Sequence, residues 1–281
     1  MCARLLREKI LEKVWFYKYK KQNRELVSII KKNQRFKNIH QGKRCFIIGN
    51  GPSLKEQDMS LLKDEIVFTV NKIAKSDFFD SIEPTYHFWA DPMFFDEKLK
   101  FNKEFKELML KTCKSKKTIT FFESVGYKYI KKNKLLKATN ACFFKAYGFV
   151  GDDVNLNFSE YVSGASTVVH YAIEMAIYMG FKEIYLLGCD CSMIIPFINS
   201  RENKVHWEES HVYETDSQEK TITQYLSNNY SMESQLFGNA RMFIGYRKLN
   251  EYCVKNKILL RNATSGGLLD NIKRVKYEEL F

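Results

Sequence analysis

The residues best suited to chemistry include a short glycine loop, Gly49-Asn50-Gly51-Pro52-Ser53, which directly follows an apolar run. Two glycines let the backbone turn sharply, and free amides beside the N-terminus of a following helix favour a bound anion. The loop lacks the lysine of a P-loop and the last glycine of a dinucleotide-binding motif. We expect it to bind the phosphate of a nucleotide. The same residues also suit a tight strand-to-helix turn in which Ser53 caps the helix.

A second turn, Ser163-Gly164, and an acidic residue, Asp190, are further candidates for ligand binding. The small residues of the turn precede a helical stretch, so they suit either an anion site or a helix cap. Asp190 follows an apolar run and could hold a ribose, a metal or a loop. Cys189 and Cys191 flank Asp190 too closely to be two ligands of an ordinary structural zinc site, and we expect no metal site.

Two histidines, His206 and His211, are candidates for a general base, because they lie in one polar, aromatic-rich segment. Histidine is the side chain best suited to take a proton from a hydroxyl near neutral pH. A surface role for either histidine stays open. The remaining histidines, expected in packing or at the surface, are His40, His87 and His170.

The elements that must position these residues alternate between strands and helices. Short apolar runs predict strands at 44–48, 64–70, 86–90, 118–122, 141–146, 183–187 and 258–260. Helical spacing predicts helices at 3–34, 166–179 and 233–255. The alternation predicts an α/β, Rossmann-like fold, with a mostly parallel sheet flanked by helices. Ligands of such sheets bind at the carboxyl ends of the strands, where the sequence has Asn50, Asn71, Asp91 and Asp190.

The charges divide the chain into two parts. Residues 1–44 hold 14 Lys or Arg and 3 Asp or Glu, and the rest of the chain is nearly neutral. We therefore expect a basic amphipathic helix or arm at 1–43 and a globular domain at 44–281. Within that domain the segment 191–232 reads as irregular and long enough to form a lid.

The basic arm has interpretations that the sequence leaves open. Its apolar residues could pack on the domain, or Trp15, Phe16, Tyr17 and Tyr19 could sit at an anionic lipid surface. An alternative class of function is a membrane- or nucleic-acid-docking protein that acts through this arm. Seven cysteines without a CxxC pair, and no secretory signal or spanning segment, predict a cytoplasmic protein, with peripheral attachment to the inner membrane face left open.

The order of the motifs resembles bacterial family 42 sialyltransferases and the related motility-accessory-factor and MptE-like proteins. The matching features lie between about residues 44 and 275. They are the motifs GNGPSL, WADP, SGAS and GFKEIYLLGCD and a predicted strand ending in Asn71. In the sialyltransferases such positions bind a CMP-sugar donor. The resemblance therefore implies donor contacts for Asn50, Gly51, Ser53, Asn71, Ser163 and Gly164.

Three departures from the sialyltransferase pattern concern the site. The family has asparagine where this chain has Asp91, and no histidine precedes the last long helix. The family's phosphate-binding tyrosines after the GxD turn are also unmatched, and Tyr213, Tyr225 or Tyr230 could take their catalytic role. His211-Val212-Tyr213 instead looks like the His-x-Tyr element of the wider group. The base implied by the resemblance is therefore His211, with His206 as the second choice.

The resemblance implies an inverting, base-catalysed glycosyltransferase whose nucleotide-sugar-binding catalytic domain is formed by residues 44–281. It would move sialic or a related nonulosonic acid from a CMP-type donor to a bacterial surface glycan or its lipid-linked precursor, with no cofactor required. An alternative is a pterin diphosphokinase-like enzyme that uses ATP and Mg²⁺ held by Asp91 and Asp190. Self-association into a homo-oligomer is left open.

Overall fold

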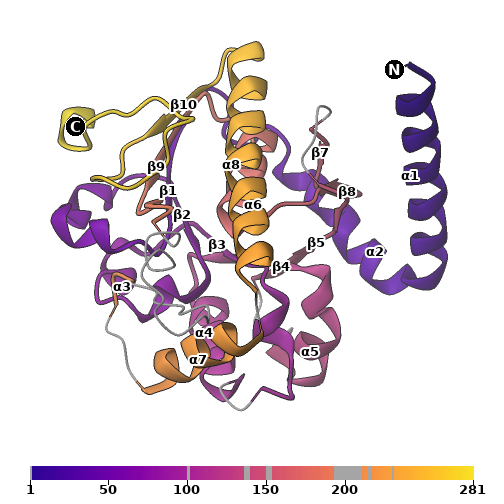
Figure 1. Ribbon diagram of the computed structural model, residues 1–281, viewed down its shortest axis with the longest axis horizontal. Helices are drawn as coiled ribbons and strands as arrows, with labels where there is room; N and C mark the ends of the chain where they lie inside the picture. The colour runs from indigo at the N-terminus through magenta and orange to yellow at the C-terminus, as the bar shows by residue number, and fades with distance from the viewer. Residues whose placement is uncertain are drawn as a thin grey trace.

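The computed structural model describes residues 2–99, 102–135, 140–149, 154–192, 211–213, 217–229 and 231–281. Within these ranges seven strands form one sheet in the order β10-β9-β1-β2-β3-β4-β5, and every neighbouring pair is parallel (Figure 1). The strands are β1 (Arg44–Ile48), β2 (Val67–Val70), β3 (Tyr86–Trp89), β4 (Ile119–Glu123), β5 (Ala141–Phe144), β9 (Glu183–Leu187) and β10 (Leu259–Asn262). The predicted Rossmann-like α/β fold is confirmed.

The position of β1 in the middle of the sheet decides where a ligand can bind. Strands β2 to β5 follow on one side of it, and β9 and β10 lie on the other. The chain therefore runs from β1 and from β9 to opposite sides of the sheet, and ligands of such sheets bind at the carboxyl ends of the strands where the direction changes.

Both faces of the sheet are covered, which is why its strands read as continuous apolar runs. On β1, Cys45 and Ile47 belong to the core beneath α6, whereas Phe46 and Ile48 belong to the core on the opposite face. The helices are α1 (Cys2–Gln22), α2 (Arg24–Lys31), α3 (Phe79–Ile82), α4 (Asn102–Lys114), α5 (Tyr127–Lys132), α6 (Val168–Tyr178), α7 (Ser217–Asn229) and α8 (Met232–Lys255).

The expectation of an irregular segment at 191–232 is wrong for residues 217–229, which form α7. Ile222 and Leu226, one helical turn apart, pack against the aromatic core around Phe94 and Phe122. Residues 193–210, 214–216 and 230 of this segment lie outside the described residues, and so does the predicted candidate His206. The lid therefore stays a prediction.

A small second sheet supports the N-terminal helix. It consists of β6 (Ala146–Tyr147), β7 (Leu156–Asn157) and β8 (Tyr161–Ser163), with β8 in the middle. Helix α1 stands at the edge of the molecule beside this sheet (Figure 1). Trp15 stacks on Tyr147 with ring centroids 3.7 Å apart, and the buried ring of Phe16 lies 4.7 Å from that of Tyr161. These two aromatic residues face the protein, and a domain boundary at residue 43 stays a prediction.

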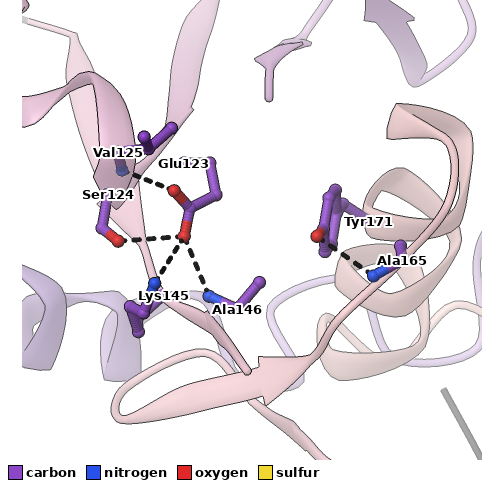
Figure 2. A network of polar contacts seen from close by, with 7 residues as sticks. All are labelled: Glu123, Ser124, Val125, Lys145, Ala146, Ala165 and Tyr171. Carbon is purple, nitrogen blue, oxygen red and sulfur yellow. Dashed lines mark hydrogen bonds and ion pairs between the residues drawn. The ribbon is translucent and has the colours of Figure 1, made fainter. Parts of the chain in front are cut away.

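The carboxyl end of β4 is fastened to the second sheet by Glu123 (Figure 2). Its buried carboxylate accepts hydrogen bonds from four surrounding groups, which are Ser124 Oγ, Val125 N, Lys145 Nζ and Ala146 N. The start of β6 is thereby held next to the main sheet. Since β6 pairs with β8, this network also fixes the turn that leads from β8 into α6.

Candidate active site

A cavity of about 980 Å³ lies at the carboxyl ends of β1, β2, β3 and β9. That volume suits a nucleotide-sized ligand together with a second small molecule. The cavity is roofed by the first turns of α6 and by the N-terminal half of α8. Predicted site residues that line it are Gly49, Asn50, Gly51, Pro52, Asn71, Asp91, Asp190 and His211.

The glycine loop is tied down by the loop that follows β9. The amide of Gly49 donates to the carbonyl of Leu187 (2.8 Å), and that of Gly51 to the carbonyl of Gly188 (2.9 Å). A Cβ on Gly51 would lie 1.6 Å from Asp190 Oδ2, so no larger residue fits there without displacement. The close approach of two loops explains the glycines.

Asp190 holds the same loop from its other end. Its carboxylate accepts hydrogen bonds from Ser53 Oγ (2.8 Å) and from the Ser53 amide (3.3 Å). Ser53 therefore does not cap the following helix, which is a 3₁₀ turn over Pro52–Glu56. Burial raises the pKa of Asp190, and the bonds from Ser53 partly offset that rise. Of the three roles left open for Asp190, the geometry shows the one of holding a loop.

The loop offers fewer free amides than its sequence indicates. The amides of Gly49, Gly51 and Ser53 already have acceptors within the protein, as described above. Among the described residues, Lys72 after β2 and Arg241 on α8 bring positive charge to the cavity. These two side chains would therefore balance most of the negative charge of a bound phosphate.

Two asparagine side chains offer acceptors to a ligand. The buried Oδ1 atoms of Asn50 and Asn71 have no hydrogen-bond partner among the described residues. Asn71 adopts a left-handed backbone conformation with φ of 48°, which turns the chain sharply at the end of β2. An unpaired buried acceptor is costly, so a ligand that supplies N–H or O–H groups would be stabilised here.

His211 stands beside the glycine loop because of one backbone contact. The amide of Val212 donates to the carbonyl of Asn50 at 3.1 Å, which fixes the short segment 211–213 against the loop. His211 lines the cavity and stacks on Tyr213 with ring centroids 4.8 Å apart. Tyr213 itself is buried, with the ammonium of Lys72 5.7 Å from its ring centroid. A basic side chain and the glycine loop thus share one cavity.

Ser163 and Gly164 lie behind the cavity wall. Ser163 Oγ accepts a hydrogen bond from the Asn155 amide (2.9 Å), and a Cβ on Gly164 would meet the carbonyl of Gly148 at 2.2 Å. The part of this turn that lines the cavity is 165–169. It is held by Tyr171, whose hydroxyl accepts a hydrogen bond from the Ala165 amide at 3.1 Å (Figure 2).

Lys72 and several residues of α8 line the cavity, although the sequence did not single them out as site residues. Gln235, Asn239, Met242 and Tyr246 line the cavity at helical spacing, a polar-to-apolar stripe that was visible in the sequence. The guanidinium of Arg241 lies 4.4 Å from the ring centroid of Phe149. No sequence motif joins this arginine to the glycine loop, because the fold alone brings them to one cavity.

Two histidines and two cysteines near the sheet have pKa values that burial shifts. His87 and His170 are fully buried, which confirms their place in packing, and burial lowers the pKa of both to about 3. Burial also raises the pKa of Cys191 to about 12 and that of Cys189 well above its usual value. Neutral thiols are poor metal ligands and nucleophiles. Within the described part of the chain, no three His, Cys, Asp or Glu residues cluster as a metal site.

Comparison with known proteins defines the family. A model of the family described as 6-hydroxymethylpterin diphosphokinase MptE-like matches residues 19–195. The match covers more than half of the chain, so the protein belongs to this MptE-like family, which confirms that part of the predicted resemblance. No curated protein matches the chain significantly in sequence.

One solved structure with a similar fold is that of the sialyltransferase CstII from Campylobacter jejuni, in complex with a substrate analogue, cytidine-5'-monophosphate. It is 19% identical, with 84% of this chain and 85% of that chain covered and a TM-score of 0.46.

No helix among the described residues is both long and apolar enough to cross a bilayer.

Proposed function

We propose that this protein is a glycosyltransferase that moves an acidic sugar, sialic or a related nonulosonic acid, from a CMP-type nucleotide to a hydroxyl of a bacterial surface glycan or its lipid-linked precursor. The observation that carries the proposal is the position of His211. It lines the same cavity as the glycine loop and is tied to that loop through the Val212–Asn50 backbone bond. A base and a nucleotide-sized space stand together, as transfer to a hydroxyl requires.

Different residues of the cavity would bind different parts of the nucleotide. Asn50 and Asn71 present unpaired oxygens that would accept hydrogen bonds from amino or hydroxyl groups of the nucleotide. Lys72 and Arg241 bring positive charge for its phosphate. That charge stabilises the CMP leaving group as the bond between the sugar and the phosphate oxygen breaks.

His211 would act on the acceptor. As the sugar carbon loses its phosphate and gains oxocarbenium character, the acceptor hydroxyl attacks it from the opposite side, and His211 takes the hydroxyl proton. The configuration at the sugar carbon is thereby inverted. The donor is a substrate, and the reaction needs no further cofactor.

The family description favours a second candidate, a diphosphokinase that transfers a pyrophosphoryl group from ATP to a pterin hydroxyl. Its Mg²⁺ would be held by Asp91 and Asp190, which both line the cavity. Each carboxylate already accepts a hydrogen bond from its own neighbourhood, Asp91 from the Met93 amide and Asp190 from Ser53. Binding Mg²⁺ would therefore displace or share these bonds.

Thermal unfolding of the full chain across a nucleotide panel tests the proposal. CMP and CMP-sialic acid should raise the melting temperature without Mg²⁺, because a ligand that binds only the folded state stabilises it. AMP and GMP serve as matched monophosphate controls. A rise with ATP that depends on Mg²⁺, with none for CMP, would instead support the diphosphokinase.

A further inference from the structure

Helix α1 has an outer face that the other described residues leave exposed. Ile10, Leu11, Val14 and Tyr17, called here the outer stripe, are each between 45% and 56% exposed. Ile10, Val14 and Tyr17 follow one another at helical spacing, so they lie on one side of the helix. Trp15 and Phe16, whose rings contact Tyr147 and Tyr161, point to the other side. Scattered exposed apolar residues are ordinary, whereas four together on one helix are not.

Lysines border the outer stripe. Lys13, Lys18, Lys20 and Lys21 are all exposed, and Glu12 is the one acidic residue between positions 10 and 22. The ammonium of Lys21 lies 4.7 Å from the ring centroid of Tyr17, which places positive charge directly at the stripe. An apolar face flanked by lysines, with an aromatic ring among them, is the pattern of a helix lying in a membrane interface.

We propose that the outer stripe of α1 docks the protein on the surface of an anionic lipid bilayer. The apolar side chains enter the boundary between headgroups and acyl chains, and the lysines contact the anionic headgroups. The charge distribution fits this partner, since residues 1–44 hold 14 of the 45 Lys and Arg but only 3 of the 33 Asp and Glu. A nucleic acid would be bound by the lysines alone and gives no reason for an exposed apolar stripe.

The docking requires no rearrangement of the fold. Trp15 stays stacked on Tyr147, so the inner face of α1 holds the protein while the outer face meets the lipid. Of the four aromatic residues expected at the lipid, Tyr17 belongs to the outer stripe. Trp15 and Phe16 contact the second sheet instead, and Tyr19 packs against the aromatic core around Phe94 and Phe122. The proposal is independent of the reaction, because it concerns a face outside the cavity.

Sedimentation of the full chain with vesicles tests the docking in the absence of any substrate. We expect binding to vesicles of phosphatidylglycerol and phosphatidylcholine, little binding to phosphatidylcholine alone, and weaker binding as salt is raised. Replacing Ile10, Val14 and Tyr17 together by serine should lower vesicle affinity about tenfold or more. Val254→Ser, which changes a 70% exposed apolar residue on α8, is the matched control and should leave the affinity unchanged.

The charge is tested separately from the apolar face. Changing Lys13, Lys18 and Lys21 to glutamate should lower the affinity about a hundredfold or more. Lys63, Lys114 and Lys116, which are exposed elsewhere, provide a control with the same change in net charge.

Circular dichroism should show that all these variants stay folded, since the changed side chains are exposed. Equal binding by the stripe variant and wild type would overturn the proposal. So would retention of RNA or DNA without vesicle binding, or a dimer in solution that the stripe variant converts to a monomer.

Discussion

Gly51 is the residue on which the shape of the cavity wall depends most directly. A Cβ there would lie 1.6 Å from Asp190 Oδ2 and 2.7 Å from the carbonyl of Gly188. Because the second neighbour is backbone, the strain cannot be relieved by rotating a side chain. The alternative site for the same substitution is Gly238 on α8, where an added Cβ meets no atom within 4 Å.

The substitution Gly51→Ala should therefore lower the free energy of unfolding by about 1–3 kcal/mol and weaken CMP binding, because it pushes the two loops apart. Gly238→Ala should raise the free energy of unfolding by about 0.5–1 kcal/mol, since alanine is the better helix former. Chemical denaturation of both variants makes the comparison. Equal effects of the two would show that the loop contact is not a constraint.

Arg241 is predicted to recognise the phosphate of the nucleotide. Arg241→Gln should lower CMP affinity about tenfold or more, because a hydrogen bond to a charged group is lost, and should leave the affinity for cytidine unchanged. Arg247→Gln on the same helix is the control, since Arg247 is exposed and pairs with Glu251 at 2.7 Å. Calorimetric titration of both variants with CMP and cytidine is the measurement. An equal loss for cytidine would contradict a phosphate contact.

At the scale of the elements, helix α6 places an ionisable side chain, that of Glu174, in the core. This residue is fully buried, and neither carboxylate oxygen has a hydrogen-bond partner among the described residues. Burial raises the pKa of Glu174 well above its usual value. The stability that goes with the protonated form is fully present below the unfolded-state pKa and is lost as the pH rises through the folded-state pKa.

Glu174→Met should therefore stabilise the protein by about 1–3 kcal/mol at pH 8, because it removes unpaired polar atoms from the core. The gain should shrink at pH 5, where the wild-type carboxyl group stays protonated in the fold. Guanidinium unfolding of both proteins at the two pH values measures this difference. A gain of the same size at both values would show that ionisation of Glu174 is not the cause.

The strands could be predicted well because burial on both faces gives them short, continuous apolar runs. Residues 44–48 and 183–187 appear with the predicted bounds as β1 and β9. Helix α7 could not be predicted, because only Ile222 and Leu226 pack it against the core and the stretch around them is mostly polar. The second sheet was missed for a similar reason, since its strands have only two or three residues each.

The position of the cavity could be predicted from the polar residues, asparagine or aspartate, that follow the strand ends. Asn50, Asn71, Asp91 and Asp190 were expected at the carboxyl ends of strands and are found lining one cavity. The bond between Ser53 and Asp190 joins residues 137 positions apart, so no local pattern could reveal it. Arg241 was missed because only the fold brings α8 to the cavity that the glycine loop also lines.

At the scale of the whole molecule, two surfaces have separate tasks in this account. We propose that the cavity at the strand ends binds the nucleotide and the acceptor, and that the outer stripe of α1 holds the protein at a lipid surface. An acceptor linked to lipid would connect these tasks, because it lies at the surface on which α1 docks. The two proposals nevertheless fail separately, since vesicle binding is measured without nucleotide and nucleotide binding without vesicles.

The most direct test of the central claim is the release of CMP from CMP-sialic acid by the full chain, without Mg²⁺ and with a panel of oligosaccharide acceptors. The wild type should release CMP and transfer the sugar. His211→Gln should slow this about 10²–10⁴-fold while it still binds CMP, and His206→Gln should retain the rate. No release of CMP by the wild type, or an unchanged rate in His211→Gln, would contradict it.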